Sequence, residues 1–237
     1  MKQKTPSEPI LKLDNVSYQY RNQYTAVDAV KGVNAEFYEG KMYAIIGKSG
    51  SGKSTLLSLM AGLALPSEGQ VVYRGTATDS VDLDKYRRQN VAVVYQSFNL
   101  FPLMTCLENV CFPLELMGKK PKEAAVTAKE YIEHVNLPDS VYKRFPNMIS
   151  GGEKQRVGIA RALASGAKVI LADEPTGNLD IANGEKIVQL LRDLAHEDNY
   201  TVIVVTHDMS ITQLADEVMQ MSDGYLLPLV AEGGSRS

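Results

Sequence analysis

Residues 42–55 read MYAIIGKSGSGKST, in which five apolar residues run directly into a loop of glycine, serine and lysine. The segment Gly47–Thr55 fits the phosphate-binding pattern GxxxxGKS/T, the Walker A motif, and the apolar stretch LLSLMAGL that follows it suits a helix. Small residues let the backbone curl close to phosphates, so that successive N–H groups and the start of the next helix point at negative charge. This strand, loop and helix predict an α/β fold that grips a nucleoside triphosphate.

Different residues of the loop are expected to contact different parts of the bound nucleotide. Lys53 is expected to reach the β- and γ-phosphates, and Ser54 is expected to bind Mg²⁺. A flexible glycine and serine loop without a ligand would not need the preceding strand and the following helix. We therefore expect nucleotide binding along the whole loop, namely at Gly47, Lys48, Ser49, Gly50, Ser51, Gly52, Lys53, Ser54 and Thr55.

The composition indicates a globular protein of one domain. The chain has 237 residues, of which 44% are hydrophobic, enough to bury a substantial core. Lys and Arg number 25 against 28 Asp and Glu, so charge gives no reason to expect nucleic acid as a ligand. No stretch approaches the roughly 18 apolar residues that cross a bilayer, and the opening MKQKTPSEP has no apolar signal region. We expect a cytoplasmic protein.

Hydrophobic periodicity divides the chain into a core and a helical insertion. The alternating stretches ILKLDNVSYQY and VKGVNAEFYEG predict an antiparallel β region. Further strands are predicted at VVYRG, VAVVYQ, VILADEP and TVIVVTHD, in a sheet covered by helices on both faces. The helical spacing of ENVCFPLELMG and PKEAAVTAKEYIEHVNL predicts an inserted helical subdomain. We expect one domain, 1–237, with a core of 1–96 and 165–227, a helical subdomain at about 97–164, and a tail at 228–237 that frays.

Two adjacent carboxylates, Asp173 and Glu174, follow the apolar residues VILA in the stretch KVILADEP. In a protein with a phosphate loop, this is where a second acidic element belongs. Asp173 at the strand end can hold Mg²⁺. Glu174 is one residue further and points differently because strand side chains alternate, so it can orient or deprotonate the attacking water.

Two further polar residues follow predicted strands but are weak signals alone. His207 comes after TVIVVT, and its imidazole could reach the γ-phosphate from the rim of the sheet. Gln96 comes after VAVVY, and its amide could contact Mg²⁺ or the water nucleophile. Either residue could equally be an ordinary polar group at the end of a strand.

The stretch ISGGEKQRVGIARAL predicts a second anion site. Ser150, Gly151 and Gly152 open a helix whose N-terminal N–H groups point at negative charge. A helix capping box between Ser150 and Glu153 explains the serine and the glutamate but leaves the paired glycines unexplained. Glycine early in a helix costs conformational entropy, so we expect another group to approach closely there.

Together these motifs resemble the nucleotide-binding subunits of ABC transporters, over most of the chain and in the order of that family. The resemblance rests on the phosphate loop, Gln96, the signature motif from Ile149 to Glu153, the acidic pair, the Asp-loop GNLD that ends at Asp180, and His207. It also implies that Tyr20 stacks on adenine, with Tyr18 close enough to compete for that position. The implied fold is a P-loop NTPase (RecA-like) core with an N-terminal antiparallel β region and an inserted α-helical subdomain.

The resemblance implies a head-to-tail homodimer that hydrolyses ATP. Each of two ATP molecules would be held by the phosphate loop of one subunit and by the Ser150–Gly152 helix start of the other, with Asp180 nearby. Glu174, His207 and Gln96 would be catalytic, and Ser54, Gln96 and Asp173 would hold Mg²⁺. Hydrolysis would open the dimer and move an integral membrane permease that contacts the helical subdomain near Phe98–Leu103, on the inner face of the cell membrane.

Within the family, FNLFPLMTCLENVCFPL followed by DEPTGNLD is similar to the subgroup of the exporter MacB, the lipoprotein-releasing ATPase LolD and the cell-division ATPase FtsE. A MacB-like exporter of peptides, drugs or lipoproteins is favoured. One alternative is an FtsE-like regulator of cell-wall hydrolases. Another is an amino-acid importer ATPase, although importers typically carry Ser-Ala where this chain has Gly177 and Asn178.

Overall fold

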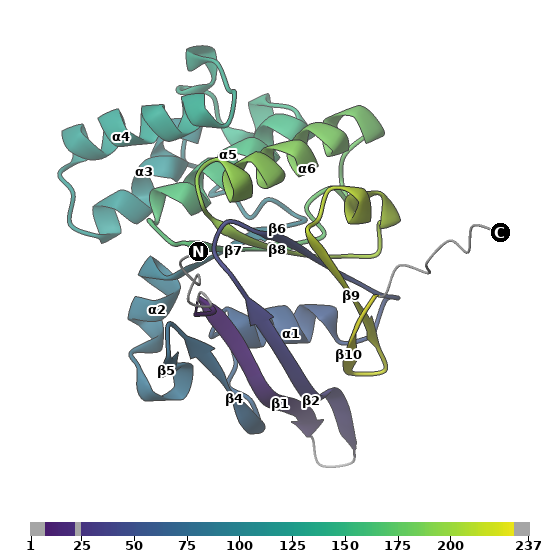
Figure 1. The fold of residues 1–237 in the computed structure, drawn as a ribbon. Coiled ribbons are helices and arrows are strands. Elements are labelled where there is room, and N and C mark those ends of the chain that lie inside the picture. Colours follow the sequence, from purple (N-terminus) through teal and green to yellow (C-terminus); the bar gives the residue numbers. More distant parts are fainter. Residues whose placement is uncertain (1–7, 22–24, 230–237) are drawn as a thin grey trace, which may run out of the picture.

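The computed structural model describes residues 8–21 and 25–229 and contains two β-sheets with helices around them (Figure 1). The larger sheet has the strand order β10-β9-β3-β8-β7-β6. Its neighbours pair in parallel except for β10 and β9, which are antiparallel. The strands are β3 (Met42–Ile46), β6 (Val91–Tyr95), β7 (Val169–Asp173), β8 (Thr201–Thr206), β9 (Glu217–Ser222) and β10 (Tyr225–Pro228).

The smaller sheet is antiparallel and lies toward the N-terminus. Its strand order is β2-β1-β4-β5. The strands are β1 (Leu11–Arg21), β2 (Ala26–Phe37), β4 (Glu68–Tyr73) and β5 (Thr76–Ala77). The predicted antiparallel β region is thus confirmed, and the alternation of buried and exposed residues along β1 explains it, since one face of this sheet covers the core.

Helices connect the parallel strands. They are α1 (Lys53–Met60), α2 (Leu83–Gln89), α3 (Cys106–Leu116), α4 (Pro121–His134), α5 (Gly151–Ala164) and α6 (Ile181–His196). After β6 the chain leaves the sheet, forms α3, α4 and α5, which pack on one another, and returns to it at β7. The sequence patterns above did not single out α2, α6, β5, β9 or β10.

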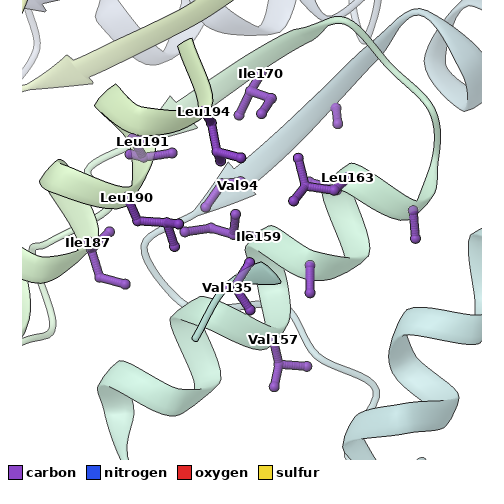
Figure 2. Close-up of a cluster of buried hydrophobic side chains, with 14 of the residues drawn as sticks. Val94, Val135, Val157, Ile159, Leu163, Ile170, Ile187, Leu190, Leu191 and Leu194 are labelled. Carbon is purple, nitrogen blue, oxygen red and sulfur yellow. The ribbon is translucent and has the colours of Figure 1, made fainter. Parts of the chain in front are cut away.

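The larger sheet separates two hydrophobic clusters. Successive side chains of a strand point to opposite faces of the sheet, so alternate residues belong to different clusters. Met42 and Ala44 of β3 belong to the cluster under α3–α6, whereas Tyr43 and Ile45 belong to the one under α1. Figure 2 shows part of the first cluster, in which side chains of α5 and α6 gather with Val94 of the sheet. The second face is covered by α1 together with the antiparallel sheet rather than by helices alone.

The predicted fold class, a P-loop α/β core with an antiparallel β region and a helical region, is confirmed. In the part of the chain that the structure describes, no helix combines the length and the apolar composition that crossing a membrane requires. The predicted tail was to begin at residue 228, but Pro228 ends β10 and the Leu229 N–H donates to the Val218 carbonyl at 2.9 Å. The rest of that tail, 230–237, lies outside the described residues.

Candidate functional site

The phosphate loop joins β3 to α1 and closes on its own lysine. Lys53 is 7% exposed, and its Nζ donates hydrogen bonds to the carbonyl oxygens of Gly47 (2.7 Å) and Lys48 (3.0 Å). Gly52, the N-cap of α1, has φ +106°, and a Cβ there would lie 2.2 Å from the Ala29 carbonyl oxygen. Only glycine fits this position, so the loop keeps its backbone N–H groups clustered at the start of α1.

This loop forms one wall of a cavity of about 960 Å³. The cavity gathers most of the residues predicted for the site: Tyr20, Lys48, Ser49, Gly50, Ser51, Gly52, Lys53, Ser54, Thr55, Gln96, Asp173, Glu174 and His207. Gly47 lies just behind the lining, where a Cβ would meet the Met221 carbonyl oxygen at 2.3 Å. Residues brought in by β2 and by the turn after β9, such as Ala29 and Asp223, complete the wall and were not predicted.

At one end of the cavity an aromatic ring is available for stacking. Tyr20 is 54% exposed, and its hydroxyl lies 3.2 Å from the Thr55 hydroxyl. Tyr18 packs edge-on against Tyr20 with ring centroids 5.0 Å apart, but it lines a different hollow. Of these two tyrosines, Tyr20 is therefore the one that lines the phosphate-loop cavity.

The oxygen atoms of Ser54 and Asp173 lie side by side under the loop, and the Ser54 Oγ is 3.4 Å from an Asp173 carboxylate oxygen. Burial raises the pKa of Asp173, and the neighbouring charge of Glu174 raises it further, while Ser54 and Lys53 act in the opposite direction. A cation would relieve this penalty. Hydroxyl and carboxylate oxygens are the ligands that Mg²⁺ prefers, so this pair fits the ion.

Glu174 lies beyond the end of β7, and its direction is not set by strand alternation as we expected. Its φ is +46°, in the left-handed region, so the backbone turns sharply there. One carboxylate oxygen lies 2.9 Å from Nδ1 of His207, and the other accepts a hydrogen bond of 2.8 Å from the Thr206 hydroxyl. The turn and these contacts aim the carboxylate into the cavity.

Gln96 follows β6 and lies beside the Asp-loop. Its backbone carbonyl accepts a hydrogen bond of 2.9 Å from the Asn178 side chain. A Cβ at Gly177 would lie 2.6 Å from the Gln96 side-chain nitrogen, so a larger residue at 177 would displace the amide. The glutamine that lines the cavity is therefore held by the segment that leads to α6.

The predicted second anion site lies elsewhere on the same chain. Ser150 is the N-cap of α5 and forms the predicted capping box with Glu153, but Ser150, Gly151 and Gly152 do not line the phosphate-loop cavity. The close approach expected at the glycines is made by this chain itself. Cβ atoms at Gly151 and Gly152 would lie 3.2 Å from Leu179 and 3.1 Å from Asn183.

Asp180 lies outside the phosphate-loop cavity as well. It caps α6 by accepting a hydrogen bond of 2.9 Å from the Asn183 N–H. It lines a neighbouring hollow of about 1040 Å³ that also reaches Glu174 and His207. The structure thus brings Asp180 next to the acidic and histidine groups but not to the phosphate loop.

Glu153→Gln is expected to leave the ATPase rate within a few fold of the natural chain. The Ser150 N–H donates to the Glu153 carboxylate at 2.7 Å and is the main cause of its lowered pKa, and a Gln amide oxygen can accept the same bond. Steady-state phosphate release by the two proteins checks this. A loss of about a hundredfold or more, the size expected on removing a general base, would contradict it.

Comparisons with known proteins agree with this geometry. The family model described as "ABC transporter" matches residues 30–177. The chain is 42% identical over 226 residues to the ABC transporter ATP-binding protein Rv0986 of Mycobacterium tuberculosis, covering 94% of this chain and 91% of the relative. It is 39% identical over 215 residues to YclH of Bacillus subtilis, covering 91% and 94% of the two chains.

Solved structures agree as well. The dimeric cassette MJ0796 of Methanocaldococcus jannaschii matches with a TM-score of 0.84 and 40% identity, covering 93% of this chain and 99% of the other. A post-hydrolysis state of MJ0796 with ADP and Pi gives the same values. The cassette cbiO1 of Clostridium perfringens, part of the cbiONQ complex, matches with a TM-score of 0.83 and 28% identity, covering 93% and 88%. This protein therefore belongs to the ABC transporter family, as one of its ATP-binding subunits that hydrolyse ATP.

Proposed function

We propose that this protein is the motor subunit of an ABC transporter, which closes as a homodimer around two ATP molecules and drives a MacB-like membrane permease. The observation that carries the proposal is the division of the two anion sites on one chain. The phosphate loop, the acidic pair and His207 share a cavity, whereas Ser150–Gly152 lie outside it. A second copy that supplies its Ser150–Gly152 helix start would complete the site.

Each residue of the cavity then has a chemical task. The loop N–H groups and Lys53 bind the phosphates, and Tyr20 stacks on adenine. Ser54 and Asp173, with the Gln96 amide, hold Mg²⁺, which supplies neutralisation of phosphate charge.

Glu174 and His207 act on the attacking water and on the terminal phosphate. Glu174 takes the proton of the attacking water, and His207 contacts the γ-phosphate. The 2.9 Å contact between these two side chains supports a shared task.

The dimer can be tested by combining two substitutions. Glu174→Gln with saturating MgATP is expected to elute as a dimer, because ATP that is not hydrolysed keeps both sites closed. Adding Ser150→Arg should return the protein to a monomer that still binds ATP, since Ser150 lies outside the cavity of its own chain. Size-exclusion chromatography with light scattering, together with an ATP-binding titration, measures both properties. A double variant that still dimerises, or one that loses ATP binding, would contradict the composite site.

The segment Phe98–Leu103 is the proposed contact for the permease. Leu103 is 91% exposed and Phe101 is 39% exposed, so the segment offers neighbouring apolar side chains to a partner. Phe101 and Phe112 also line a cavity of about 390 Å³ between the sheet and α3. The complex that contains cbiO1 supports a membrane assembly of this kind. We place the protein on the inner face of the cell membrane, with no nucleic acid as partner.

One arginine links this segment to α5, the helix that Ser150 caps. Arg161 of α5 donates hydrogen bonds to the carbonyl oxygens of Asn99 (2.8 Å) and Phe98 (3.3 Å). Burial lowers the pKa of its guanidinium. A displacement of Phe98–Leu103 by the permease would therefore be transmitted to α5 through Arg161. This supports the proposal that residues of about 97–164 move as a helical subdomain.

The choice of permease class rests on the Asp-loop. GNLD is typical of the MacB-like subgroup, and in this chain Asn178 and Gly177 both lie against Gln96. Replacing the pair with Ser-Ala, as in amino-acid importers, would remove the Asn178 hydrogen bond and crowd the Gln96 amide. The FtsE-like and importer alternatives are separated from the MacB-like proposal by the identity of the membrane partner.

A further inference from the structure

The last residue of β8 touches three parts of the site at once. Thr206 is fully buried, and its hydroxyl lies 2.8 Å from Oε2 of Glu174. The same hydroxyl lies 3.0 Å from the backbone nitrogen of Asp208, in the segment that carries His207. Its carbonyl oxygen accepts a hydrogen bond of 3.3 Å from the Gly47 N–H, where the phosphate loop begins.

The donor and acceptor inventory fixes the direction of both side-chain bonds. An ionised carboxylate only accepts, and a backbone N–H only donates. The single hydroxyl hydrogen of Thr206 must therefore point at Glu174, and its lone pair must accept from Asp208. Because the hydroxyl is fully buried and both of its bonds are made, it has no other orientation of comparable energy.

The Glu174 side chain needs a hydrogen-bonding partner to fix its position, because Glu174 lies after the end of β7 and strand geometry does not set its direction. Its φ of +46° lies in the left-handed region, and its N–H donates to the Val205 carbonyl at 2.9 Å. Oε2 of Glu174 also accepts a longer hydrogen bond of 3.4 Å from the His207 backbone N–H, and Oε1 contacts the His207 side chain, which is 69% exposed. When His207 turns to a phosphate, as proposed above, Thr206 is the side chain that still holds the carboxylate.

We propose that Thr206 is a positioning residue for ATP hydrolysis, whose hydroxyl holds Oε2 of Glu174 so that Oε1 faces the attacking water. The inference rests on the proposed assignment of Glu174 as the general base. Thr206 itself does not line the phosphate-loop cavity. Its effect is expected in the chemical step and not in the binding of ATP.

Thr206→Val and Thr206→Ser test this directly. Valine keeps the shape and removes the hydroxyl, so kcat for phosphate release is expected to fall by about ten- to a hundredfold, with KM for ATP within twofold. Serine keeps the hydroxyl and should return kcat to within about threefold of the natural chain. Thr206→Ala should repeat the loss of kcat if the valine protein is not recovered folded.

Thr201→Val is a matched control in the same strand. Thr201 is also a fully buried threonine of β8, and its hydroxyl donates to the Tyr38 carbonyl at 3.2 Å, away from the cavity. Its removal should lower the melting temperature about as much as Thr206→Val does and leave kcat unchanged. This comparison separates positioning from general stability.

The outcomes distinguish this inference from the proposal on which it rests. Natural kcat in Thr206→Val, equal losses in the valine and serine proteins, or a rise in KM at unchanged kcat would each overturn the positioning assignment. If Glu174→Gln hydrolyses ATP normally, the assignment of Glu174 as the base is what fails. Inactive Glu174→Gln together with fully active Thr206→Val refutes only the inference about Thr206.

Discussion

Glu174→Gln is expected to lower the rate of ATP hydrolysis by about a thousandfold, because a general base contributes roughly 10²- to 10⁴-fold to a reaction of this kind. The amide keeps the shape of the side chain and can still accept the 2.8 Å hydrogen bond from Thr206. It cannot take a proton from water. Phosphate release at saturating MgATP measures the loss, and a titration with a fluorescent ATP analogue should show unchanged affinity.

Glu153→Gln is the matched control for this substitution. Both changes replace a carboxylate by an amide, but Glu153 caps α5 and Glu174 faces the cavity. A large loss in Glu174→Gln and a small one in Glu153→Gln would assign the effect to the position of the carboxylate. If Glu174→Gln retains more than about a tenth of the natural rate, another group acts as the base.

Lys53→Ala is expected to weaken ATP binding by about a hundredfold, or roughly 3 kcal/mol, because hydrogen bonds to charged groups contribute about 1.5–3 kcal/mol each. The ammonium group now donates to the carbonyl oxygens of Gly47 and Lys48, inside the loop. Removing it deletes the cation that faces the phosphates and also loosens the loop. Isothermal titration calorimetry with a non-hydrolysable ATP analogue measures the affinity.

Lys53→Arg helps to interpret that loss. Arginine keeps the positive charge but is larger and planar, so it does not fit the closed loop around Nζ as lysine does. We expect its affinity to fall between those of the natural chain and Lys53→Ala. Natural affinity in the folded alanine protein would show that the loop does not bind the phosphates through this side chain.

The phosphate loop and strands β3, β6, β7 and β8 were predictable because their signals are local. The apolar run Met42–Ile46 forms β3 with every residue buried, and added Cβ atoms at Gly47 and Gly52 of the following loop would collide with Met221 and Ala29. The capping box at Ser150 was equally local and is present. Such features depend on a few neighbouring residues, and the sequence contains them in order.

The direction of Glu174 was not predictable. Strand alternation suggested it, but the left-handed φ depends on contacts with β8, which is distant in sequence. The wall formed by Ala29 and Asp223 was missed for the same reason, since neither residue carries a motif. α6 had a usable signal, because Asp180 is a favourable N-cap before residues with helical spacing. Thr206 has no signal of its own, since its importance follows from the atoms around its hydroxyl.

The central claim is that this ATPase works on a membrane permease, and one measurement tests it most directly. Tagged Glu174→Gln is purified in gentle detergent from native membranes with MgATP, in parallel with Glu174→Gln that also carries Leu103→Asp, and the attached proteins are identified by mass spectrometry. We predict an integral membrane protein with a large extracytoplasmic domain in the first sample and its depletion in the second. Recovery of only soluble proteins, ribosomes or nucleic acid in both samples would contradict the claim.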